Sequence, residues 1–304
     1  MKKYRAWKII SMVVVVILLV VGGIFAYTYI RTQNLINDSY KAAHNKELRN
    51  PNSQITNNKP ISVLLLGTDT GAFNRTERGR TDTMILATIN PRSEQTTLLS
   101  IPRDTRTSVP GFPNLGQIKI NAAYAYGSTG TAMNTVQKLV DNPVDYYVLI
   151  NMGGLEKLID QVDGVDVKSP LTFDFAGYQF EKGEEYHMDG KKALEFSRMR
   201  HEDPQGDYGR QTRQRLVITA LIKKIAQPST LANTALLEEL NKNVQTDLKF
   251  NQLRDLALRY RGASKKIVSD HVQGRGQMID GQAFEVVSPD ERERVIKVVK
   301  DSLH

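Results

Sequence analysis

The stretch ISVLLLG, residues 61–67, decides where the folded part of this chain begins and what kind of sheet it builds. Its apolar run ends at a glycine and shows no polar face, which is typical of a buried strand. The preceding stretch, NPNSQITNNKP at residues 50–60, is polar and rich in turn-forming residues. We therefore predict a stalk or linker over residues 31–60, whose first part continues as a helix, and one folded domain over residues 61–304.

Strand and helix patterns alternate along the rest of the chain. TMILATIN (residues 83–90) and TTLLSIP (96–102) are separated by the turn signal PRSEQ, which predicts a hairpin of core strands. Further strands are expected at residues 144–151, 164–170, 265–274 and 281–288, with a loop at 171–190 and a hinge at 275–278. Helices are expected at residues 131–140, 154–164, 191–201, 210–226, 231–240 and 253–260. A final helix is expected from Pro289, with Ser288 as its N-cap and Glu291 as the capping-box partner of Ser288. This alternation indicates an α/β or α+β domain with helices covering a sheet.

The N-terminus carries the clearest pattern in the sequence. Residues 1–8 are basic, and residues 9–30 contain no charged side chain. Such a run is long enough to cross a hydrocarbon core of roughly 30 Å, and the excess of cations before it predicts a cytoplasmic N-terminus and an outward-facing remainder. A cleaved signal peptide is the alternative, but the run exceeds the usual apolar region of about 7–15 residues and no A-x-A site follows it.

Composition narrows the classes of partner. The chain has no cysteine and a formal net charge of +8. Disulfides, cysteine-ligated zinc and thiol catalysis are therefore excluded. A basic protein can meet nucleic acid, a membrane surface or an anionic substrate, and the outward topology disfavours nucleic acid. We expect anionic wall polymers, lipid headgroups or lipid-linked phosphates as partners.

Standard catalytic motifs are missing from the sequence. No G-x-x-x-x-G-K-[ST], G-x-G-x-x-G, H-E-x-x-H or G-x-S-x-G pattern occurs, and the five histidines show no ligand spacing. A nucleophilic-serine hydrolase, a zinc hydrolase and a standard nucleotide-binding loop are therefore unsupported.

Charged residues gather at the ends of the predicted core strands. Asp69 follows the first strand, Arg80 and Asp82 open the second, and Arg103 and Asp104 follow the third. Each group alone is typical of solvated strand-end charges, whereas together they favour a site for an anion and a metal. If the second and third strands form a hairpin, their directions reverse, so Arg80 and Arg103 need not be adjacent.

A second concentration of charge lies in FSRMRHEDPQGDYGRQTRQR, residues 196–215. Arg198 and Arg200 end a predicted short helix, and Asp207, Arg210, Arg213 and Gln214 open the long helix. Arginine near a helix N-terminus opposes the macrodipole, but a bound anion reverses this effect. We assign Arg210 and Gln214 to an anion site, and Arg215, Lys223 and Lys224 to a solvated basic face. Arginines interspersed with carboxylates suit a pyrophosphate–magnesium complex.

These motifs resemble those of the LytR-CpsA-Psr family of Gram-positive bacteria. The matching stretches are LLLGTDT, GRTDTM, LSIPRDT, NAAYAYG, LEFSRMRH and DYGRQTRQR, which follow a basic N-terminus, an anchor and a stalk. The resemblance implies an α/β fold, a three-layer α/β/α sandwich with a central mixed sheet and a tunnel for a polyprenyl chain, preceded by one transmembrane helix. It also implies a single-pass protein of the cell membrane, with its N-terminus cytoplasmic and its catalytic domain extracytoplasmic.

The resemblance further implies an activity. Such proteins transfer an anionic glycopolymer, such as wall teichoic acid or capsule, from an undecaprenyl-pyrophosphate carrier to a muramic acid C6 hydroxyl of peptidoglycan, forming a phosphodiester. By motif match, Asp69 and Asp82 would bind Mg²⁺, with Mn²⁺ as an alternative metal. Arg80, Arg103, Arg198, Arg200, Arg210 and Gln214 would bind the pyrophosphate, with Asp207 beside them, and Arg80, Asp82 and Arg103 would take part in catalysis. Asp82 is a candidate general base, Asp104 a supporting carboxylate and Arg213 a structural residue.

The same residues suit two other functions. A pyrophosphatase would hydrolyse the lipid carrier, and would differ only in admitting water at the acceptor position. An anchored polymer-binding or regulatory protein would bind without chemistry, although no helix-turn-helix signal supports DNA binding. Six apolar residues can line a lipid tunnel, although plain core packing accounts for each: Val63, Leu65, Ile85, Leu149, Leu216 and Leu221.

Overall fold

The computed structural model describes residues 39–68, 79–227, 230 and 234–304. The predicted membrane anchor at residues 9–30 and the candidate metal ligand Asp69 lie outside this part of the chain. Within the described part, no helix combines the length and the apolar character that crossing a bilayer requires.

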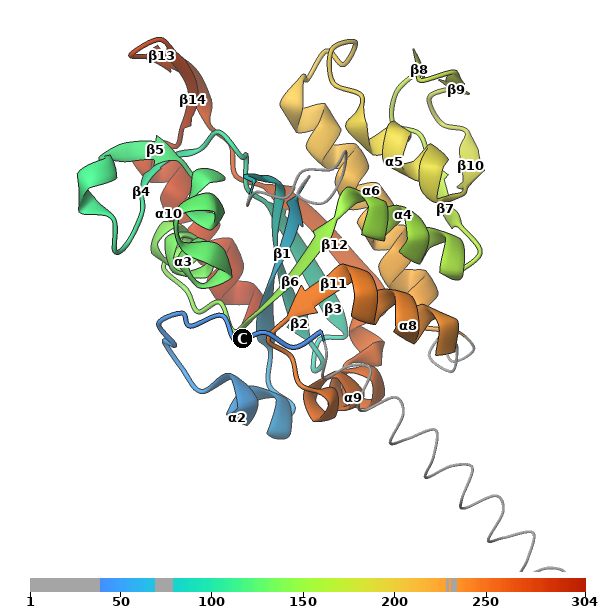
Figure 1. Cartoon of the computed structure of the whole chain (residues 1–304), viewed down its shortest axis with the longest axis horizontal. Helices are drawn as coiled ribbons and strands as arrows, with labels where there is room; N and C mark the ends of the chain where they lie inside the picture. The colour runs from blue at the N-terminus through green and yellow to red at the C-terminus, as the bar shows by residue number, and fades with distance from the viewer. Residues whose placement is uncertain (1–38, 69–78, 228–229, 231–233) are drawn as a thin grey trace, which may run out of the picture.

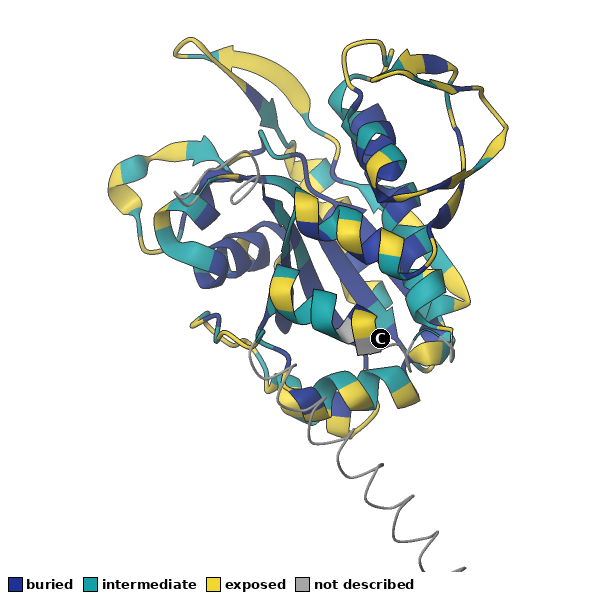
Figure 2. Cartoon of the chain, turned by 45° about the vertical axis from the view of Figure 1, so that its right-hand side comes forward, coloured by how far each residue is buried: buried dark blue, intermediate teal, exposed yellow. Residues whose placement is uncertain are grey.

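A mixed six-stranded sheet lies at the centre of the molecule, with the strand order β11-β6-β1-β2-β3-β12 (Figure 1). Its strands are β1 (Ile61–Thr68), β2 (Thr81–Asn90), β3 (Gln95–Ser100), β6 (Tyr146–Asn151), β11 (Val244–Thr246) and β12 (Lys266–His271). β1 is antiparallel to β2 and parallel to β6, whereas β3 is antiparallel to β2 and parallel to β12. The stretch at residues 61–67 is thus an interior strand of a largely buried sheet (Figure 2), which explains its lack of a polar face.

The predicted hairpin of β2 and β3 is confirmed, and its geometry answers a question that the sequence left open. Ile85 lies opposite Ser100, and Asn90 lies opposite Gln95. In an antiparallel pair, the start of the first strand and the end of the second lie at the same end of the sheet. The reversal therefore brings the start of β2 and the segment after β3 to the same edge of the sheet, where Arg103 pairs with Asp82.

Helices cover both faces of the sheet (Figure 1). They are α2 (Pro51–Thr56), α3 (Ala122–Val140), α4 (Met152–Gln161), α5 (Gly190–Arg198), α6 (Asp207–Ile225), α8 (Thr234–Asn243), α9 (Phe250–Arg259) and α10 (Pro289–Ser302), with short 3-10 helices η2 (Pro113–Leu115) and η3 (Arg261–Ser264). On one face, α3 and α10 pack on Leu64 and Leu66 of β1. On the other face, side chains of α6 and α9 pack near Val63 and Leu65. The alternation of these four residues between two cores follows from the two-residue period of a strand.

A smaller lobe lies beside α4, α5 and α6 and contains structure that the sequence did not reveal. It holds the short pairs β7 (Val165–Lys168) with β10 (Glu185–Met188) and β8 (Phe173–Phe175) with β9 (Tyr178–Phe180). Three of these strands fall in the segment predicted as a loop, and their core is a cluster of buried aromatic rings. The predicted hinge at residues 275–278 likewise belongs to β13 (Arg275–Ile279), which pairs with β14 (Gln282–Val286). The remaining pair is β4 (Arg106–Ser108) with β5 (Gln117–Lys119).

The start of α10 forms one of its two expected capping contacts. The Ser288 side chain accepts a hydrogen bond from the backbone N–H of Glu291, which confirms the N-cap of α10. The Glu291 carboxylate instead accepts bonds from Arg294 and from the backbone N–H of Gln273. The full capping box is therefore not formed, because an ion pair and a neighbouring strand end take the glutamate.

The expected linker before β1 packs against the domain from residue 39 onward. Ile55 of α2 is only 1% exposed, and the Arg49 guanidinium pairs with the buried carboxylate of Asp145, at 2.8 Å through Nε. A Cβ added to Gly130 of α3 would lie 2.0 Å from the carbonyl oxygen of Ala43, so this segment lies directly on the helix. The expectation of a linker up to residue 60 is therefore corrected, because buried contacts hold residues 39–60 in the folded unit.

Candidate active site at the polar end of a cavity

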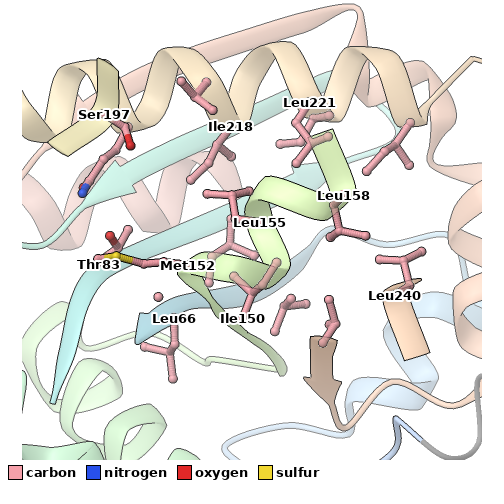
Figure 3. A pocket seen from close by; sticks show the side chains of 18 of the residues that line it. Leu66, Thr83, Ile150, Met152, Leu155, Leu158, Ser197, Ile218, Leu221 and Leu240 are labelled. Carbon is pink, nitrogen blue, oxygen red and sulfur yellow. The ribbon is translucent and has the colours of Figure 1, made fainter. Parts of the chain in front are cut away.

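A cavity of about 1080 Å³ lies between the sheet and the helices α4, α5, α6, α8 and α9 (Figure 3). Asp82, near the start of β2, and Ile89, near its end, both line it. Seven residues of strand span about 23 Å, so the cavity extends along most of β2. Its walls are mainly apolar, with Ile150, Leu155, Ile218 and Leu221 among the side chains in Figure 3. A space of this length and character suits a long hydrocarbon chain.

The structure separates the six apolar residues that the sequence offered for a lipid tunnel. Leu65 and Leu221 line the cavity. The other four belong to the surrounding core clusters: Val63, Ile85, Leu149 and Leu216. The periodicity of a strand or helix identifies a buried face, but it does not say whether that face meets protein or space.

One end of the cavity is polar and collects most of the predicted site residues. Six of them line this end, namely Asp82, Arg103, Arg198, Arg200, Arg210 and Gln214. They come from β2, from the segment after β3, from the end of α5 and from the start of α6. Asp207 does not line the cavity but forms an ion pair with Arg210, which does. Asp69 lies outside the described residues.

Asp82 and Arg103 form an ion pair at the mouth of the hairpin. Nη1 of Arg103 donates to Oδ1 of Asp82 at 2.6 Å. Burial lowers the pKa of Arg103, but Asp82, Asp207 and Asp104 outweigh it, so the pKa is raised and the guanidinium stays charged. Its Nε is buried and has no hydrogen-bond partner among the described residues. The Asp104 carboxylate pairs mainly with Lys119, at 2.7 Å, and does not line the cavity.

Arg80 is not where the sequence analysis expected it. Its residue is exposed and does not line the cavity, and it forms no ion pair with the described part of the chain. We expected Arg80 and Asp82 to serve a metal–diphosphate complex rather than a salt bridge. No ion pair joins these two residues within the described part of the chain, and Asp82 pairs with Arg103 instead.

The start of α6 holds a second group of paired charges. Asp207 accepts from Nε of Arg210 at 3.0 Å and from the side-chain amide of Gln211 at 3.0 Å, and Arg200 lies 3.8 Å away. Burial raises the pKa of Asp207, but the charge of Arg210 and the hydrogen bond from Gln211 together lower it by more. The pKa of Asp207 is therefore below its ordinary value. Arg210 is 7% exposed, and its guanidinium lies 3.4 Å from the backbone carbonyl oxygen of Asp82, which links α6 to β2.

Arg213 organises the loop between α5 and α6 rather than facing the cavity. Its side chain is fully buried and donates to the carbonyl oxygens of Phe196, at 3.0 Å, and Met199, while pairing with Asp203. These bonds tie the end of α5 to α6, and so hold Arg198 and Arg200 beside Arg210. The expectation that Arg213 is structural fits this arrangement.

The expectation for Arg215 is corrected. We assigned it to a solvated basic face, but it is 6% exposed and donates to the hydroxyl of Ser100 at 2.7 Å. Lys223 is exposed, and Lys224 pairs with Asp166 at 3.3 Å, as expected of a solvated face. Arg215 lies on the side of α6 that faces the sheet, and charge alone did not reveal this.

Sequence reasoning missed two side chains that support the arginines. Glu195 of α5 lines the cavity and accepts from Arg198 at 3.2 Å, three residues away. Gln211 holds Asp207 four residues away and is almost fully buried. Both spacings place side chains on one face of a helix, so the helical period was a signal that could have found them.

Among the described residues, one carboxylate at the cavity is of the kind that could bind magnesium. Asp82 presents carboxylate oxygen at the cavity, and oxygen is the ligand that Mg²⁺ prefers. No cluster of three or more His, Asp or Glu side chains that could hold a metal occurs within the described residues. Asp82 therefore fits a magnesium ligand, and the second expected ligand, Asp69, stays a prediction.

The site is thus a long apolar cavity that ends in four arginines, whose lining suits a lipid with an anionic head. The comparisons with known proteins place the chain in a family. The chain belongs to the LytR_cpsA_psr family, which matches residues 26–301. The family resemblance stated from the motifs is thereby confirmed.

Individual relatives cover almost the whole chain. The chain is 40% identical over 304 residues to the polyisoprenyl-teichoic acid–peptidoglycan teichoic acid transferase TagU of Enterococcus faecalis. This match covers all of this chain and 99% of the relative. The crystal structure of Bacillus subtilis TagU matches with a TM-score of 0.65 and 35% identity over 81% of this chain and 97% of that one. A structure of TagT bound to LIIa-WTA matches with a TM-score of 0.69 and 25% identity over 86% of this chain and 98% of that one. The mixed α/β fold is thus that of the family.

Proposed function

We propose that this protein is a transferase that moves an anionic glycopolymer, such as wall teichoic acid or capsule, from an undecaprenyl-pyrophosphate carrier to peptidoglycan. The observation that carries the proposal is a long apolar cavity that ends at Arg103, Arg198, Arg200 and Arg210. A polyprenyl chain needs apolar walls, and the pyrophosphate attached to it needs guanidinium groups. The names of the relatives, polyisoprenyl-teichoic acid–peptidoglycan teichoic acid transferases, support the same reaction.

The proposed reaction is an in-line displacement at the glycopolymer-side phosphorus. The oxygen of a muramic acid C6 hydroxyl forms the new P–O bond, and the bond from that phosphorus to the bridging oxygen breaks. Polyprenyl phosphate leaves with the bonding electron pair, and the hydroxyl proton is released. Such transfers depend mainly on positioning and charge stabilisation, which arginines supply without a covalent enzyme intermediate.

Each side chain at the polar end has a role in this proposal. Arg103 and Arg210 neutralise the pyrophosphate oxygens, and Arg198, Arg200 and Gln214 hold its outer side. Asp207 orients Arg210 and keeps Arg200 near it. Arg80 is retained as a further pyrophosphate ligand and catalytic residue on its motif match alone.

Magnesium is the metal that the proposed reaction would use. Asp82, together with Asp69, would hold Mg²⁺ or Mn²⁺, and the ion would neutralise charge on the pyrophosphate. Asp82 is also a candidate to accept the hydroxyl proton. Its ion pair with Arg103 ties the two groups into one unit at the cavity mouth.

We also propose the placement of the protein in the cell. Residues 9–30 would anchor it in the membrane of a Gram-positive cell, with the domain outside. The helices on both faces of the sheet support a three-layer α/β/α sandwich. Peptidoglycan and the lipid carrier would then both be within reach of the cavity.

A product assay tests the proposal and distinguishes it from hydrolysis and from binding alone. The full chain in vesicles would receive a lipid-pyrophosphate-linked glycan, a peptidoglycan oligomer and Mg²⁺. We expect a phosphodiester-linked product, and a loss of about 100-fold in kcat/KM for Arg210→Ala, because one charge-assisted contact is removed. Lys223→Ala, an exposed cation on the same helix, is the matched control and should leave kcat/KM unchanged. Free phospho-glycan would indicate a hydrolase, and absence of any product would indicate a binding protein.

A further inference from the structure

The end of the cavity remote from the arginine cluster is basic as well. It is lined by Arg254 and Ala257 of α9 and by Arg261 and Ser264 of η3. Thr96, at the turn end of the β2–β3 hairpin, also lines it and donates to the carbonyl oxygen of Ala263 at 3.0 Å. The arginine cluster lies at the opposite end of the same hairpin. The cavity therefore has two polar ends, of which the proposed reaction uses only one.

The surface around this second end combines cations with an exposed leucine. Residues 249–266 contain six Lys or Arg and a single acidic residue, Asp255. Leu258 is 74% exposed and lies four residues after Arg254, on the same side of α9, and the exposed Arg261 opens the η3 helix that follows. A single exposed leucine needs no explanation by itself, but here it lies among cations at the lip of an apolar cavity. We call Lys249, Arg254, Leu258, Arg259 and Arg261 the α9 surface.

The first described residues lie at the same end of the molecule, a short stretch of sequence after the proposed anchor. Ser39, the first described residue, lines the same cavity, and the Lys249 ammonium lies 5.6 Å from the ring centroid of Tyr40. Nine steps of chain separate Ser39 from the end of the apolar run at residue 30. Fully extended, they span at most about 30 Å. The hairpin β13–β14 lies at the other end of the molecule from α9 (Figure 1).

We propose that the α9 surface docks on anionic phospholipid headgroups, so that the second end of the cavity opens at the membrane. Lysine and arginine side chains are attracted to the negative potential of such a surface, and an adjacent exposed leucine can enter the headgroup layer. A polyprenyl tail would then pass between bilayer and cavity without crossing water. This inference rests on the proposed anchor, and it adds a partner surface that the transfer reaction does not itself require.

The cysteine-free sequence allows a direct test with single labels. The full chain would carry an environment-sensitive fluorophore at Leu258→Cys or, as the matched control, at Met278→Cys, which is 70% exposed on β13. Both would be reconstituted into vesicles of neutral phosphatidylcholine, with or without anionic phosphatidylglycerol and with a headgroup-region quencher. We expect blue-shifted, quenched emission at position 258 in anionic vesicles, weakening at high salt, and none at position 278. Equal behaviour of the two labels would overturn the proposal.

A charge variant makes the same test specific to the α9 surface. Arg254→Gln with Arg261→Gln should remove at least half of the quenching at position 258. Lys182→Gln with Arg275→Gln, two exposed cations elsewhere, changes net charge equally and should leave the quenching intact. Retention of quenching in the first variant would contradict the proposal. Flotation of the vesicles reports the anchor separately: protein that fails to float overturns both anchor and docking, whereas a loss of transfer activity alone leaves docking untouched.

Discussion

Single carboxylates hold the arginines of the cavity in place. Arg103 pairs with Asp82 at 2.6 Å, Arg198 with Glu195 at 3.2 Å, and Arg210 with Asp207 at 2.8 Å. These pairs keep long side chains ordered at the lip of an apolar space before any anion arrives. Preordered donors contribute more to binding a charged transition state than flexible ones, because they lose less freedom on binding.

Substitution Asp207→Asn tests this positioning role. It keeps the shape of the side chain but removes the charge that holds Arg210 and Arg200, so we expect kcat/KM to fall by roughly 10- to 100-fold. Because the pKa of Asp207 is lowered, the carboxylate stays ionised at every pH above its ordinary value, and activity should show no step from this group between pH 5 and 8. Asp174→Asn, on the exposed surface of β8, is the control. An unchanged kcat/KM for Asp207→Asn would contradict the role.

Asp247 is predicted to make stability depend on pH. Burial, together with Glu47 and Asp145, raises its pKa to about 7, although the backbone N–H of Tyr147 donates to its carboxyl at 2.9 Å. The folded state then holds a proton that the unfolded state has lost, so stability should fall as pH rises from about 4 to about 7. Asp247→Asn keeps the acceptor oxygen and should raise the free energy of unfolding at pH 8, measured by urea denaturation, by at least about 1 kcal/mol, with little change at pH 4. Equal effects at both pH values would refute this.

At the scale of elements, close helix contacts shape the cavity wall. A Cβ added to Gly190, at the start of α5, would lie 2.1 Å from the carbonyl oxygen of Glu156 in α4. Gly190→Ala should therefore push the two helices apart and destabilise the fold by about 1–3 kcal/mol in urea denaturation. Gly153→Ala in α4 is the control, because the nearest atom to its Cβ would be 3.8 Å away. Equal stability of the two variants would show that the α4–α5 contact adjusts freely.

Long elements could be predicted from the sequence, whereas short ones could not. β1, β2 and β3 are apolar runs bounded by turn residues, and the second half of α6 is rich in apolar residues, so their local patterns agree with the fold. β8, β9 and β10 each have three or four residues, too few for a period to emerge, and they form because aromatic side chains such as Phe180 and Phe196 bury together. The burial of Arg215 depends on the Ser100 hydroxyl from another element, which no local pattern contains.

The assembly of the site across the whole molecule was predicted only in outline. Six candidate residues meet at one cavity end because β2, β3, α5 and α6 all place a terminus there. The motif order suggested these residues, but the partner of Asp82 depended on strand direction, and Arg80 was not placed at the cavity. The cavity itself depends on the distance between the helices and the sheet. The pattern of apolar residues along the sequence does not encode that distance.

The attachment of residues 39–60 gives a prediction for the whole domain. Arg49→Ala leaves the Asp145 carboxylate buried with Ser62 as its one remaining hydrogen-bond partner among the described residues, so we expect a loss of about 2–3 kcal/mol in the free energy of unfolding. Lys59→Ala, whose side chain is exposed, should change stability by less than about 0.5 kcal/mol. Urea denaturation of the full chain measures both. Identical curves would mean that this segment adds nothing to the fold.

The most direct measurement of the central claim follows one phosphorus atom. The lipid carrier would be radiolabelled at the glycan-side phosphorus and incubated with the full chain, peptidoglycan and Mg²⁺. The proposed transfer predicts that the label moves into a phosphodiester on peptidoglycan while unlabelled polyprenyl phosphate is released, and that Arg210→Ala slows this while Lys223→Ala does not. Label recovered as soluble glycan phosphate, or left wholly in the lipid carrier, would contradict the proposed function.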